Sequence, residues 1–154
     1  MLTKSICKYP KKIIKQVKYL IKNKIPVMGH LGLLPQSAKG NFKSKGRTIN
    51  EIKQLMNDAS LLQKNGVFAI VLECIKTPVA KKITQNLKIP TIGIGSSVYC
   101  DGQVLVTDDL IGLNQTNIRF VKKFLNLKKY INLGVKRFAK EVRLRKYPTK
   151  KHSY

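Results

Sequence analysis

The chain has 154 residues, 43% of them hydrophobic, which is enough to bury one core, so we expect a single domain. Its three cysteines, Cys7, Cys74 and Cys100, are odd in number, widely spaced and not clustered with histidine. This pattern argues against a disulfide framework and against a zinc site. A reducing cytosol fits the cysteine content.

The charge is strongly positive, because 31 Lys and Arg stand against 7 Asp and Glu, for a net charge of +24. Such a charge on its own suggests a polyanionic partner. However, the lysines are spread over every predicted element and accompany abundant Ile and Asn, a trio that A/T-rich codons also produce. A diffuse positive charge attracts phosphates but reads no bases, so we expect no specific nucleic-acid partner.

The N-terminal stretch, residues 1–24, carries lysines every few positions. It therefore has neither the apolar core of a signal peptide nor the ~20 apolar residues of a membrane helix. It also lacks the arginines that are typical of import peptides. We expect a cytoplasmic protein with no membrane partner.

In chain order, residues 10–23 have apolar side chains at helical spacing with lysines between them, which predicts an amphipathic helix. Residues 25–29 form a short apolar run that predicts a buried strand, followed by a loop at 29–32. Residues 35–47 are polar and contain glycines, which predicts a long loop. Thr48 then begins a second helical pattern, with Glu51 placed as in a capping box and Asn65-Gly66 at its end.

The middle of the chain alternates between strand and helix patterns. Residues 67–72 are continuously apolar, as in a strand buried on both faces. Thr77-Pro78 supplies an N-cap and a first-turn proline for a helix that runs to about Leu87, and two further strands are predicted at 90–95 and 104–106. This order predicts an α/β fold with parallel strands joined by right-handed crossovers, although the pattern does not distinguish a barrel from an open sheet.

From Ile118 onward, apolar residues alternate with Lys and Arg, which predicts one or two amphipathic basic helices and a polar tail. A helix that lies on a membrane surface has a similar pattern. A solvated basic face is the simpler interpretation, and we adopt it.

Two side chains stand at the ends of predicted strands, where the active sites of α/β proteins collect. Glu73 follows six apolar residues directly, and His30 follows the first apolar strand between Gly29 and Gly32. Glu73 has the chemistry of a general acid or base, whereas a glutamate that caps a helix or pairs with a lysine is the competing interpretation. His30 is a second candidate at a strand end, and a histidine with a purely structural role is the competing interpretation.

Two glycine-containing segments are weaker candidates for binding an anion. The turn Gly93-Ile94-Gly95 allows close backbone approach but does not complete a dinucleotide-binding motif. Gly46-Arg47-Thr48 brings an arginine to the start of a helix, which suits either an anion or plain capping. The sequence has no Ser/His/Asp trio and no Walker lysine motif. From the residues alone, it predicts only a ligand site at the strand ends.

Several strings taken together resemble the ketopantoate hydroxymethyltransferase family, in family order and near family spacing. They are IPVMGHLGLLPQS (25–37), KGRT (45–48), VLE (71–73), IPTIGIG (89–95), CDGQVLV (100–106) and YPTKKHSY (147–154). The family folds as a (β/α)8 barrel. The resemblance therefore implies the second half of such a barrel, with about four parallel strands, near Val27, Val67, Thr91 and Val104, plus C-terminal basic helices. We expect one partial domain divided into 1–24, 25–117 and 118–154.

The resemblance also implies an activity, namely transfer of a hydroxymethyl group from 5,10-methylenetetrahydrofolate to 3-methyl-2-oxobutanoate on the way to pantothenate. In this family the VLE carboxylate is the proton acceptor, which carries over to Glu73, and the histidine near the substrate carries over to His30. The family binds Mg²⁺ through two aspartates and a glutamate and holds the keto acid with an Asp-Ser pair and a lysine. These residues precede the matching segment, so we expect no metal ligand in this chain.

The implied partners are the keto acid, the folate, and either further copies of the chain or a complementary N-terminal half. Four positions depart from the family pattern: Leu34 replaces Thr, Ser96-Ser97 replaces a small Ala-Gly pair, and Lys151 replaces an acid. A side chain at Ser97 would strain a backbone conformation that only glycine adopts freely. The alternative to a split or truncated enzyme is an inactive basic remnant that associates nonspecifically with nucleic acid or acidic partners.

Overall fold

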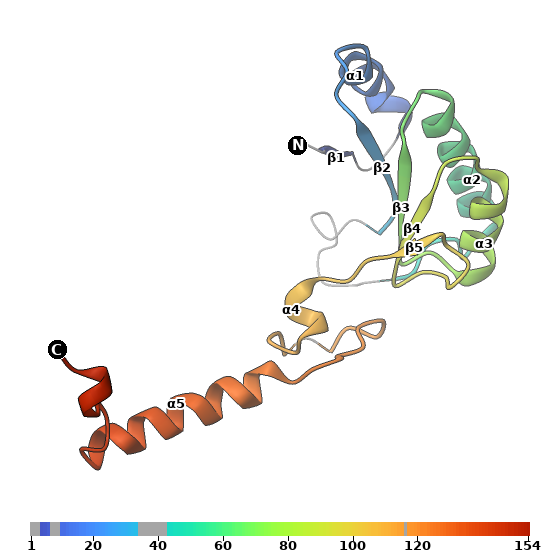
Figure 1. The fold of residues 1–154 in the computed structure, drawn as a ribbon. Helices are drawn as coiled ribbons and strands as arrows, with labels where there is room; N and C mark the ends of the chain where they lie inside the picture. The colour runs from blue at the N-terminus through green and yellow to red at the C-terminus, as the bar shows by residue number, and fades with distance from the viewer. Residues whose placement is uncertain (1–3, 7–9, 34–42, 116) are drawn as a thin grey trace. The chain divides into compact units, whose positions relative to one another are not determined.

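The computed structural model describes residues 4–6, 10–33, 43–115 and 117–154. Contacts within the chain divide it into two compact units, Met1–Val104 and Leu105–Tyr154. Figure 1 shows the elements of both units along the chain.

The first unit is built around a sheet of five parallel strands in the order β1-β2-β3-β4-β5. The strands are β1 (Lys4–Ile6), β2 (Val27–Gly32), β3 (Ala69–Glu73), β4 (Thr91–Ile94) and β5 (Gly102–Gln103). Three helices connect the first four strands: α1 (Pro10–Lys22), α2 (Ile49–Lys64) and α3 (Thr77–Asn86). The predicted alternation of parallel strands and helices is therefore confirmed.

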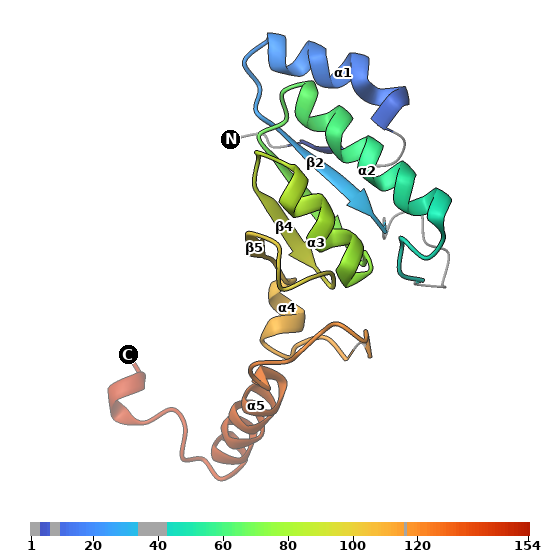
Figure 2. The ribbon, with the colours of Figure 1, turned by 90° about the vertical axis from the view of Figure 1, so that its right-hand side faces the viewer.

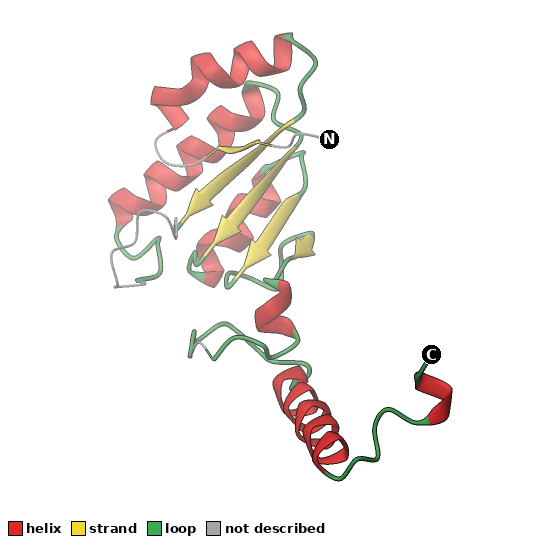
Figure 3. Cartoon of the chain, turned by 90° about the vertical axis from the view of Figure 1, so that its left-hand side faces the viewer, coloured by secondary structure: helices red, strands yellow, loops and turns green. Residues whose placement is uncertain are grey.

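All three helices cover the same face of the sheet, as Figures 2 and 3 show from opposite sides. Each strand also pairs with its sequence neighbour, so the order of the strands across the sheet follows the sequence without a reversal. In a doubly wound sheet the strand order reverses and helices lie on both faces. One-sided winding without a reversal is the arrangement of a (β/α) barrel. The tertiary structure thus decides the question that the sequence pattern left open.

The hydrophobic core lies between the sheet and its helices. It includes Val17 from α1, Leu62 from α2, Ile83 from α3 and Ile70 from β3, each at most 1% exposed. Gly29 on β2 faces this layer, because a Cβ there would lie 2.9 Å from Cδ1 of Leu62. The missing side chain lets α2 pack closely on β2.

The opposite face of the sheet is less well covered. Along β2 the burial alternates between buried and half-buried residues, so Met28 and His30 lie on the face away from the helices. Val71 and Ile92, which stand level with His30 across the sheet, are also half-buried. In a closed barrel this face would line the interior.

Several features of the structure differ from the prediction. Strand β2 runs from Val27 to Gly32, so residues 29–32, which were expected as a loop, belong to the strand. The N-cap of α3 is Lys76 and not Thr77. The last strand is Gly102–Gln103 instead of 104–106, since the Val104 N–H donates the last ladder bond to the Gly93 carbonyl and Val106 is 52% exposed. The helix predicted from Ile118 begins only at Leu127. The three-residue strand β1 was not predicted, because so short a segment carries no periodicity.

The second unit contains the short helix α4 (Thr107–Leu110), the long helix α5 (Leu127–Arg143) and a 3-10 turn at Lys150–His152. The side chain of Asn126 caps α5 by accepting the N–H of Lys129 at 3.2 Å. None of the helices among the described residues is long and apolar enough to cross a bilayer.

Candidate functional site

Glu73 and His30 meet on the face of the sheet that the helices leave open. His30 Nε2 lies 3.0 Å from Glu73 Oε2, and the two side chains are 13% and 9% exposed. The register pairs Val71 with His30 and Glu73 with Gly32, so the two side chains are diagonal neighbours on adjacent strands. The structure therefore brings together the two side chains that the sequence places at strand ends.

Backbone hydrogen bonds on both sides of β3 hold Glu73 in place. Its carbonyl accepts the Leu33 N–H at 2.9 Å, and the next residue, Cys74, donates its N–H to the Ile94 carbonyl at 3.0 Å. Gly32 approaches the Glu73 carbonyl so closely that a Cβ at Gly32 would lie 2.0 Å from it, and the φ of Gly32 is +104°. Only glycine fits at that position.

Cys74 adopts a left-handed conformation with φ of 51°, which is uncommon for a residue with a side chain. Its carbonyl accepts the N–H of Lys45 at 2.8 Å, so Lys45 lies against the end of β3. Burial of the thiol, followed by the nearby negative charge of Glu73, raises the pKa of Cys74. The thiol therefore stays protonated at neutral pH, and its sulfur is a poor nucleophile.

Gly46-Arg47-Thr48 acts as a helix cap in this structure. Thr48 Oγ1 accepts the N–H of Glu51 at 3.2 Å, and the Glu51 carboxylate accepts the N–H of Arg47 at 2.8 Å, which confirms the predicted capping role. The backbone N–H of Arg47 is the main reason that the pKa of Glu51 is lowered. Because the Glu51 carboxylate already occupies the start of the helix, the structure gives little support to an anion-binding role for Gly46-Arg47-Thr48.

The Gly93-Ile94-Gly95 turn also has a structural explanation. A Cβ on Gly93 would lie 2.7 Å from Oε1 of Gln103, so the glycine makes room for that side chain. Gln103 in turn donates from Nε2 to the Ser97 carbonyl at 2.7 Å. Neither Gln103 nor Cys74 was selected from the sequence, since nothing about a single amide or thiol reveals its role before the loops are placed.

The departures from the family pattern fall in different places. Ser97 is 3% exposed, its φ is not in the left-handed region, and its hydroxyl accepts the N–H of Tyr99 at 3.2 Å. The strain that we expected at Ser97 is therefore absent. Lys151 is exposed in the C-terminal 3-10 turn, and Leu34 lies outside the described residues.

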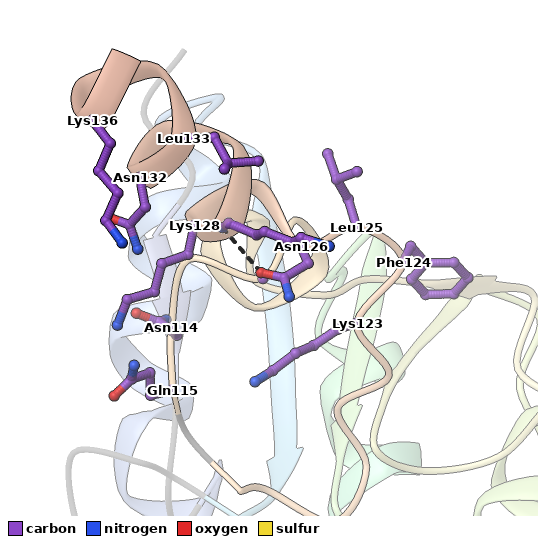
Figure 4. A pocket seen from close by; sticks show the side chains of 12 residues that line it. Asn114, Gln115, Lys123, Phe124, Leu125, Asn126, Lys128, Asn132, Leu133 and Lys136 are labelled. Carbon is purple, nitrogen blue, oxygen red and sulfur yellow. Dashed lines mark hydrogen bonds between the residues drawn. The ribbon is translucent and has the colours of Figure 1, made fainter. Parts of the chain in front are cut away.

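A concave surface of about 800 Å³ lies in the second unit beside α5. Figure 4 shows Lys128, Asn132 and Lys136 of α5 along it, with Asn114 and Lys123 from the preceding loops. Its lining residues include four lysines and no carboxylate or histidine. It offers positive charge without an acid–base pair, so it is not a candidate for proton-transfer chemistry.

The described residues do not fit a metal site. No group of three or more His, Cys, Asp or Glu side chains in this part of the chain could hold a metal ion. Glu73 and His30 together supply one carboxylate and one imidazole, which is too small a ligand set for Mg²⁺.

The one-sided parallel sheet and the carboxylate at its carboxyl end define the chain as part of a (β/α) barrel of the kind whose strand ends carry enzyme sites. The sequence model of ketopantoate hydroxymethyltransferase matches residues 7–150. The chain is also 61% identical over 144 residues to the 3-methyl-2-oxobutanoate hydroxymethyltransferase of Pelagibacter ubique (strain HTCC1062), covering 94% of the chain and 56% of that protein.

Two more distant relatives carry the same name. The protein of Francisella tularensis subsp. novicida (strain U112) is 44% identical over 141 residues, and that of Clostridium botulinum (strain Langeland / NCTC 10281 / Type F) is 43% identical over 145. These matches cover 90% and 92% of the chain and 53% of each relative. The chain belongs to the ketopantoate hydroxymethyltransferase family, a family of transferases in pantothenate biosynthesis, and spans a little over half the length of these relatives.

Proposed function

We propose that this chain supplies the proton acceptor of a ketopantoate hydroxymethyltransferase that is assembled from more than the residues present here. In the proposed reaction, 3-methyl-2-oxobutanoate takes the one-carbon unit of 5,10-methylenetetrahydrofolate and water supplies the hydroxyl oxygen, which gives 2-dehydropantoate and releases tetrahydrofolate. The observation that carries the proposal is the nearly buried Glu73 carboxylate at the end of β3, with His30 beside it. Membership of the family supports the choice of reaction.

Glu73 acts as a general base in this proposal. It accepts the proton from the carbon next to the keto group, and the electron pair of the broken C–H bond becomes the nucleophile toward the one-carbon unit. A positioned general base contributes typically ~10²- to 10⁴-fold to such a step. His30 lies on the substrate side of the sheet, close to the reacting carbon.

The proposal includes Mg²⁺ and the folate as the family's cofactor and co-substrate. Because the described residues do not form a set of metal ligands, we derive no step through the metal. A complementary segment, contributed by a separate chain or by further copies, would supply the missing contacts to the keto acid. The half-buried face that carries Glu73 is the surface against which such a segment would close the barrel. We also propose a cytoplasmic location.

The test is to coexpress this chain with the part of the Pelagibacter ubique relative that the match does not cover. The coexpressed pair should form 2-dehydropantoate, and it should exchange the C3 proton of the keto acid for deuterium in D₂O. Glu73→Gln should lower both rates at least ~100-fold, because an amide does not accept this proton. Glu51→Gln is the matched control, since glutamine also serves in a capping box.

If Glu73→Gln leaves both rates equal to those of the unmodified pair, the assignment of the base is refuted. If the pair assembles and binds Mg²⁺ but neither forms product nor exchanges the proton, the proposed reaction itself is wrong.

A further inference from the structure

The side chain of Glu73 is the one part of this residue that the sheet does not hold. Its backbone is fixed by the bonds to Leu33 on one side and, through Cys74, to Ile94 on the other. The carboxylate, however, stands on a face where its level neighbour on β2 is Gly32, which has no side chain. A general base needs a defined position, because misplacement by about 1 Å can cost ~100-fold in rate.

His30 is the group that contacts this carboxylate. Its Nε2 is 3.0 Å from Oε2, which is within hydrogen-bond distance. Both side chains are nearly buried, so a hydrogen bond between them competes little with water and is charge-assisted. The contact is directed at one of the two carboxylate oxygens, Oε2.

We propose that His30 is a positioning residue for Glu73: its Nε2–H donates to Oε2, holds the carboxylate in one rotamer, and leaves Oε1 as the oxygen that accepts the substrate's proton. No proton passes from Glu73 to His30 in this scheme. The assignment of a catalytic consequence rests on the proposed function, but the hydrogen bond and the fixed rotamer do not depend on it.

The chemistry of the side chains distinguishes positioning from a proton shuttle. A shuttle requires an imidazole that accepts and releases a proton, whereas positioning requires only an N–H at the place of Nε2. The side-chain amide of glutamine reaches to about that place and donates a hydrogen bond, but it does not carry an extra proton near neutral pH. His30→Gln therefore preserves positioning and abolishes a shuttle, and His30→Leu abolishes both.

The first experiment uses the chain by itself and reads its structure. In ¹⁵N-labelled protein, the nitrogen shifts of His30 should report a proton on Nε2, and the three-bond couplings of Glu73 should report one χ1 rotamer. His30→Leu should produce averaged couplings at Glu73, and His30→Gln should restore the single rotamer. Met28→Leu, on the same strand and face, is the matched control and should leave the couplings unchanged.

A proton on Nδ1 with a bare Nε2, or a single Glu73 rotamer in His30→Leu, would overturn the proposal. If a variant unfolds, the nitrogen shifts of the unmodified chain still decide the first point.

The second experiment uses the coexpressed pair. His30→Leu should lower kcat ~10- to 100-fold with little change in KM, which corresponds to the loss of one charge-assisted hydrogen bond. His30→Gln should recover kcat to within about threefold of the original value. If the glutamine variant is as slow as the leucine variant, His30 acts as a proton shuttle and not as a positioning residue. An effect of Glu73→Gln without any effect of His30→Leu would sink this inference and leave the proposed function standing.

Discussion

The two units of this chain use the same types of residue in opposite ways. In Met1–Val104, helices and strands bury their apolar side chains against one another, and every buried apolar side chain among the described residues lies in this unit. In Leu105–Tyr154, α5 is as clearly amphipathic as α1, yet none of its residues is buried. An amphipathic pattern thus predicts a helix reliably, but it does not say whether the same chain covers the apolar face.

The apolar side of α5 shows the contrast in detail. Ile131, Val135, Phe138 and Val142 fall on one side of the helix and are 44–61% exposed. Among the aromatic pairs of the described residues, Phe138 contacts only the ring of Tyr147, edge to face at 5.4 Å. In α1 the corresponding position is taken by Val17, which is 0% exposed under α2 and the sheet. The difference between the two helices is therefore one of tertiary partners and not of sequence pattern.

The largest expected effect comes from truncating one leucine in each unit. Leu62→Ala removes a side chain that is 1% exposed in the core and should lower the free energy of unfolding by ~2–5 kcal/mol. Leu133→Ala removes one that is 54% exposed and should change it by less than ~0.5 kcal/mol. Native-state hydrogen exchange of β3 and α5 amides measures each unit by itself. Similar losses in both would mean that the Leu133 side chain is covered in solution.

Two glycine-to-alanine substitutions, one in each unit, should change the stability of the two units in opposite directions. Gly32→Ala places a Cβ against the Glu73 carbonyl at a positive φ and should destabilise the first unit by ~1–3 kcal/mol. Gly134→Ala lies within α5, where no atom comes within 4 Å of the added Cβ, and should stabilise that helix by ~0.5–1 kcal/mol. Exchange rates of the two regions provide the measurement. A loss of stability in Gly134→Ala would reveal a close neighbour at that position.

The smallest expected effect is on the pH dependence of the first unit. Asp101 accepts hydrogen bonds from the backbone N–H and the hydroxyl of Thr91, at 2.8 and 3.0 Å, and the backbone bond is the main cause of its lowered pKa. A lowered carboxyl pKa means that the stabilisation is complete above the unfolded value, near ~4, and is lost as the pH falls through the folded value.

Unfolding by urea at about pH 6 and about pH 3, on either side of that unfolded value, tests this with Asp101→Asn as the variant. The wild-type chain should lose more stability between these pH values than the variant does. An identical loss in both would show that the Thr91 bonds do not favour the ionised carboxyl.

Much of the first unit could be predicted from the sequence, and the reasons are local. The capping box at Thr48 and Glu51, the apolar run of β3 and the proline at the start of α3 all depend on neighbours within a few residues. The boundary of the last strand could not be predicted, because it is set by the ladder with β4, a separate segment of the chain, and this ladder ends at the pair of Gly93 and Gln103.

Of the candidate site, the sequence determined the residue types and their places at strand ends. Glu73 and His30 could each be selected because an acid or an imidazole directly after an apolar run stands at the edge of a sheet. Only the tertiary structure decided that they touch, because strand register sets which side chains are diagonal neighbours, and register is fixed by long-range pairing. It also decided between barrel-type winding and an open sheet, since the face on which each helix packs depends on crossovers that no local pattern encodes.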